Sequence, residues 1–381
     1  MSPPNTKTAL KLVACAVLLL HATGCPHRSP VWSPGGSRIL LLGGKNGEEV
    51  DKAASTLWLA DVSAGSARRL ALPAAGVRYL AATWLDDAAF LAFTVKWEND
   101  SAEAGSEKSW RGTVDGSWTE LKLPPPNAER TTRRLPVVLG EGKDRAIVYH
   151  ADVYTVIVAR VEDGKEILKL DPADLIGPGP RGGFIVTRPE PENASNIEIV
   201  AFGKDLKEVW RKKYSALQNE IAGKLGKPPG DVAFNDTSTS HLPPTGEPAW
   251  VGITLVFSDV GWKEGIPAYY VRLDAASAAT LSAVHGIGLS GKPAGGGKSI
   301  LGVLAPDAKA GLPPRLAAVS LEDGKTTAEV RLEKLTKEAV HGYSLDPRGE
   351  RLALSVNGPA CALWIYDAAK LGSPKVIDLK E

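Results

Sequence analysis

The sequence of 381 residues is poor in cysteine, in methionine and in net charge. It holds three cysteines and one methionine, and its formal net charge at pH 7 is +1. A chain this close to neutrality has no basic field to attract nucleic acid. Ten tryptophans beside a single methionine favour rigid β-type packing over helical bundles. We therefore expect a β-rich protein with no nucleic-acid partner.

Long apolar runs are also scarce. The stretch Leu12 to Leu20 is uninterrupted, but it is too short to span a bilayer, which takes about 20 residues. Lys7 and Lys11 precede it, and the small residues Ala22-Thr23-Gly24 follow it before Cys25. The order of basic, apolar and small residues is typical of an export signal. No later stretch reaches the roughly 18 apolar residues of a membrane helix.

This order resembles the lipobox of bacterial lipoproteins, although Leu is usual where Ala22 stands. The resemblance implies cleavage between Gly24 and Cys25, with fatty acid such as palmitate on Cys25. Pro26 stands where Asp would favour inner-membrane retention, so a Gram-negative lipoprotein would reside in the outer membrane, facing the periplasm. An ordinary secretory signal with a chance cysteine is the alternative. The expected organisation is a signal peptide (1–24), a tether (25–30) and a folded domain (31–381).

The remaining cysteines suggest no disulfide in the mature chain. Cys15 would be lost with the signal, and lipid would occupy Cys25, which leaves Cys361 alone. Cys361 lies in the apolar run Ala360 to Trp364. Free cysteine behaves as a small hydrophobe, so we expect an inert core residue rather than a reactive thiol.

An internal repeat links the two ends of the domain. Val31 to Leu41 matches Tyr343 to Leu354 in type and order, with a proline and a glycine in each first turn. Proline and glycine preset such tight turns. A second apolar strand follows in each unit (Leu57 to Asp61, Leu363 to Asp367), and then a short last strand (Arg69 to Leu72, Lys375 to Leu379). Each unit thus has four strands in about 45 residues.

These motifs resemble TolB-like, WD-type β-propeller repeats. The resemblance implies an all-β fold, a propeller of four-stranded blades. Five middle units bring the count of blades to seven; a single misread unit would make it six or eight. The central strands of these middle units are Phe90–Phe93, Ala146–Tyr149, Phe184–Val186, Trp250–Phe257 and Ser299–Leu304. Because Lys375 to Leu379 completes its own blade, the ring would close by packing of the first blade against the last, without strand exchange.

One short inserted helix is expected between units four and five. Ser215 to Gln218 reads as a capping box, and Leu217, Ile221 and Leu225 follow at helical spacing. Gly226 would end this helix. It is either a packing insert or a partner-binding arm.

Two glycine-containing motifs suggest chemistry at first sight. Gly291 to Ser299 ends in Gly-Lys-Ser like a phosphate loop, but Lys292 stands where the first glycine is needed and a strand follows. We read it as a hairpin turn and expect no nucleotide. Asp115 to Trp118 faintly resembles the Asp-box of sialidase-type propellers, lacks one residue of that spacing, and is also read as a turn.

No catalytic motif is present in the sequence. The histidines have no zinc-ligand spacing, and there is no Gly-x-Ser-x-Gly nucleophile elbow. We therefore expect no metal, no cofactor and no enzyme, although acids from several blades could still pair in the central channel.

Long segments are concentrated between the second and third strands of the units: 43–54, 98–109, 188–196, 258–267 and 305–314. In a propeller these segments emerge on one face, and a rigid scaffold with variable loops on one face marks that face as the working surface. Trp97 and Trp262 lie in or beside them and are candidate partner-binding residues. Packing within a blade is the alternative role for each.

Three functions follow as hypotheses. The first is a lipid-anchored, non-catalytic scaffold that binds an envelope protein of unknown identity, the role that TolB-like propellers imply. The second is a propeller that binds or processes envelope polysaccharide. The third is a structural lipoprotein of a larger envelope complex.

Overall fold

The computed structural model describes residues 29–43, 53–99, 101–232, 234, 236–243, 248–256, 268–287, 292–294, 298–304, 315–331, 339–357, 361–368 and 370–379. Within these ranges, no helix is both long and apolar enough to cross a membrane.

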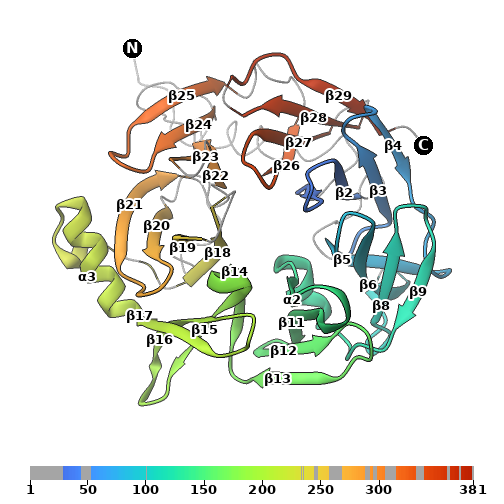
Figure 1. Ribbon diagram of the computed structural model, residues 1–381, viewed down its shortest axis with the longest axis horizontal. Coiled ribbons are helices and arrows are strands. Elements are labelled where there is room, and N and C mark those ends of the chain that lie inside the picture. The colour runs from blue at the N-terminus through green and yellow to red at the C-terminus, as the bar shows by residue number, and fades with distance from the viewer. Residues whose placement is uncertain are drawn as a thin grey trace, which may run out of the picture.

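Seven antiparallel sheets form a closed ring (Figure 1). Blade 1 holds β1 (Val31–Trp32), β2 (Arg38–Gly43), β3 (Thr56–Asp61) and β4 (Ser66–Arg69). Blade 2 holds β5 (Val77–Trp84), β6 (Ala89–Glu98), β8 (Lys108–Thr113) and β9 (Trp118–Leu121), with β7 (Ser101–Ala102) paired to β6. Blade 3 holds β10 (Val137–Leu139), β11 (Ala146–Asp152), β12 (Thr155–Arg160) and β13 (Glu166–Leu170).

The other four blades repeat the pattern. Blade 4 holds β14 (Asp174–Gly179), β15 (Gly183–Glu190), β16 (Asn193–Phe202) and β17 (Glu208–Lys213). Blade 5 holds β18 (Asp236–His241), β19 (Trp250–Val256), β20 (Ala268–Asp274) and β21 (Thr280–Ile287). Blade 6 holds β22 (Lys292–Ala294), β23 (Ser299–Leu304), β24 (Arg315–Ser320) and β25 (Thr326–Arg331). Blade 7 holds β26 (Ala339–Leu345), β27 (Arg351–Asn357), β28 (Ala362–Asp367) and β29 (Lys375–Asp378). The predicted fold class and the count of seven are confirmed, and four strands per blade is the WD-type arrangement.

The hydrophobic core lies between neighbouring blades. The central strands are apolar on both sides, as in β2, where every residue after Arg38 is buried. The outermost strands are largely exposed, as in β4. One interblade cluster joins Val148 and Val158 of blade 3 to Phe184 and Val200 of blade 4. Because each central strand packs against two neighbouring blades, its sequence lacks polar alternation.

The ring closes between blades 1 and 7 without strand exchange, as predicted. Trp32 and Ile39 share one buried cluster with Leu363 and Ile377. Three polar contacts reinforce it: the Trp32 indole N–H donates to the Ser344 carbonyl at 3.3 Å, Arg351 Nη2 donates to the Gly36 carbonyl at 2.6 Å, and Lys375 Nζ donates to the Val62 carbonyl at 2.6 Å. Packing and side-chain bonds therefore hold the seam.

The inserted helix α3 (Tyr214–Leu225) joins blade 4 to blade 5 and lies outside the ring (Figure 1). The predicted capping box is wrong, because Lys213 is the N-cap, makes no side-chain cap, and places Ser215 inside the first turn. The predicted end is confirmed: Gly226 has φ 63°, a left-handed conformation that glycine adopts readily. Leu217 and Ile221 are fully buried among blades 4 and 5, as a packing insert requires.

A second helix, α2 (Ala128–Arg133), was not predicted. Asn127 caps it, since Oδ1 accepts a hydrogen bond from Arg130 N at 2.9 Å. In Figure 1 it lies inside the ring, near β5 and β11. Three single-turn 3₁₀ segments complete the described helices: η1 (Gly142–Asp144), η2 (Pro180–Gly182) and η3 (Pro229–Asp231).

The strand order gives the ring two distinct faces. Turns between the first and second strands, and between the third and fourth, lie on one face. Turns between the second and third strands lie on the other face, together with the connections between blades. We call this second face the α2 face, because α2 lies in the connection from β9 to β10, and the first the opposite face.

Candidate functional site

Exposed apolar side chains are concentrated on the α2 face. Leu72, Leu135 and Tyr154 are 37%, 48% and 62% exposed, and all three lie in connections of this face. Among the described residues, the other exposed large apolar side chains lie on outermost strands: Ile167, Leu281 and Val376. Half of the exposed large apolar side chains of the described residues therefore lie on one face, which makes this face the candidate for protein binding.

Helix α2 brings arginine side chains to this surface. The Arg130 guanidinium lies 5.6 Å from the centre of the Tyr154 ring. Arg133 is two-thirds exposed and pairs with Glu129 at 3.3 Å. Arg134, just after the helix, is mostly buried and bonds two other blades: its Nη2 donates to the Thr237 carbonyl at 3.0 Å and lies 3.4 Å from Asp174. Arg134 therefore fixes α2 over the channel mouth. Arg130 is only 23% exposed and lies 4.0 Å from Asp174, so Arg133 is the arginine of this helix that faces outward.

A buried histidine and a partly exposed aspartate lie together beneath α2. His150 Nε2 is 3.0 Å from Asp174 Oδ1 and 3.1 Å from the backbone N of Leu175, and the imidazole has no exposed surface. Burial raises the pKa of Asp174, but the contact with His150 and the charges of Arg134 and Arg130 outweigh it, so the pKa lies below its ordinary value. A histidine that no substrate can reach supports structure rather than catalysis.

Trp97 lies at the end of β6, on the α2 face. Its ring packs against the core between blades 2 and 3, and the Arg78 guanidinium lies 4.3 Å from its centre. The indole is only partly exposed, and its N–H is buried without a hydrogen-bond partner. Blade packing therefore accounts for much of its surface, and a partner-binding role for Trp97 stays a prediction. Trp262 lies outside the described residues, as do Gly24 and Cys25.

Two of the five long segments are described in full or nearly so, and both are more ordered than expected. Part of 98–109 folds back as β7 on β6, where Lys96 pairs with Glu98 and Glu103 at 2.8 Å each. The segment 188–196 is not a loop: it extends β15 and β16, with Glu190 paired to Asn193 across the turn. The segment 43–54 is described only at its ends, and 258–267 and 305–314 lie outside the described residues.

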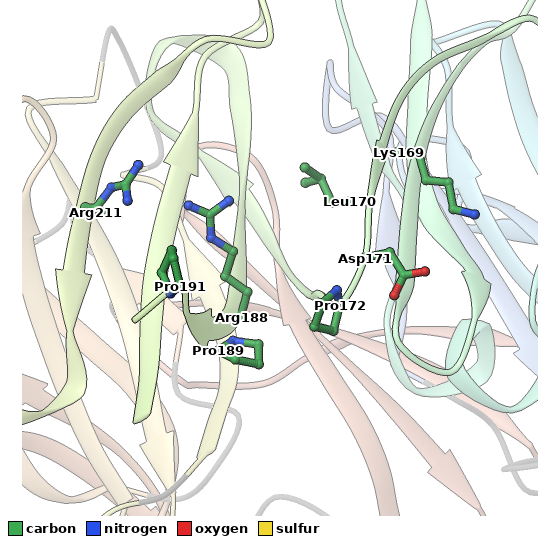
Figure 2. A pocket seen from close by; sticks show the side chains of 8 residues that line it. All are labelled: Lys169, Leu170, Asp171, Pro172, Arg188, Pro189, Pro191 and Arg211. Atoms are coloured by element: carbon green, nitrogen blue, oxygen red, sulfur yellow. The ribbon is translucent and has the colours of Figure 1, made fainter. Parts of the chain in front are cut away.

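A groove of about 440 Å³ separates blades 3 and 4 on the α2 face (Figure 2). Arg188 and Arg211 extend side by side on one wall, with Leu170 and Pro172 across from them. Both arginines are neutralised. Arg188 Nε lies 2.8 Å from the buried Glu198 carboxylate, and Arg211 pairs with Glu208 at 2.6 Å. The two arginines of the groove are thus each paired with a carboxylate of their own blade.

The two glycine-containing motifs are turns, as predicted. β22 (Lys292–Ala294) pairs antiparallel with β23, which begins at Ser299, so a strand stands where a phosphate loop would have a helix. Asp115 lies in the turn from β8 to β9, and its Oδ1 accepts from Ser117 N at 2.9 Å. Gly116, with φ 100°, completes that turn.

Neither a metal centre nor a reactive thiol stands out in the described part of the chain. No three His, Cys, Asp or Glu side chains there come together as metal ligands. The prediction of no metal and no cofactor stays a prediction. Cys361 packs at the edge of the core between blades 1 and 7, and it is half-buried rather than fully buried.

Comparisons with known proteins identify the fold and nothing finer. No protein-family model matches the sequence, and no curated protein matches it. A chain in a crystal structure of the mitotic checkpoint complex is similar over 86% of this chain and 83% of its own, with a TM-score of 0.51 and 10% identity. A chain from a study of two prolyl endopeptidases is similar over 96% of this chain but 50% of its own, with a TM-score of 0.55 and 14% identity. This protein therefore spans half the length of that chain, and identities this low show the fold alone.

Proposed function

We propose that the protein is a lipid-anchored propeller lipoprotein that binds an envelope protein through its α2 face without catalysing a reaction. The observation that carries this proposal is the exposure of Leu135, Tyr154 and Arg133 on one rigid face, with Arg130 beside the Tyr154 ring. Aromatic and arginine side chains are the preferred anchors of protein interfaces. The TolB-like repeats and the lipobox around Cys25 suggest the location and the scaffold role.

The direction of β1 suggests how the body meets the membrane. The turn after β1 lies on the opposite face, so the chain enters Val31 from the α2 face. Residues 25–30 reach at most about 20 Å when fully extended. If lipid is attached to Cys25, the α2 face is held close to the bilayer. The proposed partner is therefore a membrane protein or a protein held at the same membrane.

A polysaccharide-processing enzyme is the alternative. A propeller from a prolyl endopeptidase study shares the fold, and propellers can accompany catalysis. Against it, the ionisable pair at the described channel mouth, His150 and Asp174, is closed off from solvent on the histidine side. This favours the scaffold.

Lipid attachment is tested by substituting Cys25→Ser, with Cys361→Ser as the matched control. Wild type and Cys361→Ser are expected to incorporate labelled palmitate and to sediment with membranes. Cys25→Ser is expected to stay unlabelled and to leave the membrane fraction. A protein that stays membrane-bound and unlabelled in every form would show that the lipoprotein assignment is wrong.

A further inference from the structure

A second groove, of about 610 Å³, lies between blades 5 and 6 on the opposite face. It is lined by side chains from turns and strand ends of both blades: Arg272, Lys298, Ser299, Ser320, Glu322 and Thr327. Lys298 and Ser299 are the end of the glycine-rich motif that resembles a phosphate loop in sequence but folds as a hairpin. The groove combines two cations, three hydroxyls and one carboxylate.

Arg272 is held in place by neutral groups. Its Nε donates to Ser282 Oγ at 2.8 Å, and its Nη2 lies 3.4 Å from the Leu321 carbonyl. Its guanidinium also lies 5.7 Å from the centre of the Trp250 ring. A guanidinium has five N–H donors, and these two bonds leave three without a described partner. The side chain is thus oriented while most of its donors stay available.

Neither cation of the groove has a counterion among the described residues. Arg272 is half-buried, and no described carboxylate lies within 4.0 Å of it or of Lys298. A partly buried charge without a partner is unfavourable, and an anion bound beside it relieves that cost. Glu322 on the rim opposes such an anion, so the site would select a ligand that reaches past the rim to Arg272.

We propose that this groove binds an oxyanion, a phosphate or carboxylate group, between Arg272 and Lys298. Arginine suits this task because its planar fork matches the geometry of both oxyanions. The groove lies on the face remote from α2, so its occupancy does not depend on lipid attachment or on a protein partner. An oxyanion on a soluble ligand and one on a lipid headgroup share this chemistry.

The test titrates the full mature chain with inorganic phosphate and with acetate and follows saturable binding by calorimetry at low ionic strength. Arg272→Gln is expected to weaken binding at least tenfold, and Lys298→Gln about threefold to fivefold, because Lys298 is exposed and screened. Glu322→Gln is expected to tighten binding about threefold by removing the opposing charge. Lys325→Gln, on the same blade but outside the groove, is the matched control and should leave binding unchanged.

Vesicles distinguish the source of the anion. Binding to phosphatidylglycerol vesicles that phosphate displaces, and that Arg272→Gln abolishes, would assign the site to a lipid headgroup. Binding of phosphate or acetate without such vesicle binding would assign it to a soluble ligand. No saturable binding of either anion or of the vesicles would overturn the proposal. Binding that Arg272→Gln leaves unchanged would also overturn it.

Discussion

The groove between blades 3 and 4 and the groove between blades 5 and 6 are built from similar parts and differ in how their charges are paired. In the first, Arg188 and Arg211 are neutralised by Glu198 and Glu208. In the second, Arg272 is held by a hydroxyl and a carbonyl and has no described carboxylate partner. Under the proposal above, a half-buried arginine is structural where the protein supplies its anion, and ligand-binding where no described carboxylate does so.

The largest expected effect comes from breaking the paired groove. Glu198→Gln removes a carboxylate that is 2% exposed and leaves Arg188 with only the more distant Glu208, 3.8 Å away, as its charge partner. Breaking a buried ion pair is strongly destabilising, and with Arg188 partly exposed we expect a loss of about 2–3 kcal/mol in the free energy of unfolding. Denaturant unfolding measures it.

The control for this substitution is Glu208→Gln in the same cluster. Glu208 is 31% exposed, so its removal should cost about 1 kcal/mol or less. If Glu198→Gln and Glu208→Gln lower the free energy of unfolding equally, the burial of Glu198 does not set its contribution to stability.

A smaller loss of stability is expected at the channel mouth, where Arg130 and Arg134 both lie near the Asp174 carboxylate. The pKa of Asp174 is lowered in the folded protein, so its ionised form is stabilising at pH values above its unfolded pKa of about 3.9. That contribution is lost as the pH falls from about 5 through the lower, folded pKa. Asp174→Asn should therefore be less stable than wild type at neutral pH, and the difference should narrow below pH 4. A difference in the free energy of unfolding that stays constant with pH would contradict this account.

The smallest effect is expected for stability at the unpaired groove. Arg272→Gln loses one strong hydrogen bond and no ion pair, so without ligand it should cost about 1 kcal/mol or less. Thermal unfolding of wild type and of Arg272→Gln, each with and without phosphate, measures both the cost of the substitution and the stabilisation by the ligand. Phosphate should stabilise wild type and leave Arg272→Gln unaffected. A loss as large as that of Glu198→Gln would make Arg272 a structural arginine.

The blades could be predicted from the sequence because each one carries the same local signals. Apolar central strands and turns with proline or glycine recur from Val31 to Leu379, and the fold needs little beyond them. Helix α2 escaped prediction because Ala128–Arg133 makes fewer than two turns and has no apolar periodicity. Its one signal was Asn127, a good N-cap directly after three prolines.

The candidate sites could not be predicted, because they depend on which blades become neighbours. Arg134 contacts Asp174 and Thr237, which are 40 and 103 residues away. Arg272 and Lys298 meet only because blades 5 and 6 pack side by side. That Arg272 has no carboxylate partner among the described residues is also invisible in a sequence with nearly equal numbers of acids and bases. The order of the strands places the predicted segments on the α2 face, but the sequence did not show that 188–196 extends β15 and β16 or which side chains are exposed on this face.

The most direct test of the scaffold proposal is photo-crosslinking in intact membranes from two positions on the two faces. A photoreactive residue at Tyr154 samples the α2 face, and one at Lys325 samples the opposite face; both side chains are exposed. We predict a discrete crosslink to a membrane-associated protein from position 154 and none from position 325. A crosslinked protein from position 325 alone would contradict the assignment of the α2 face as the partner-binding surface.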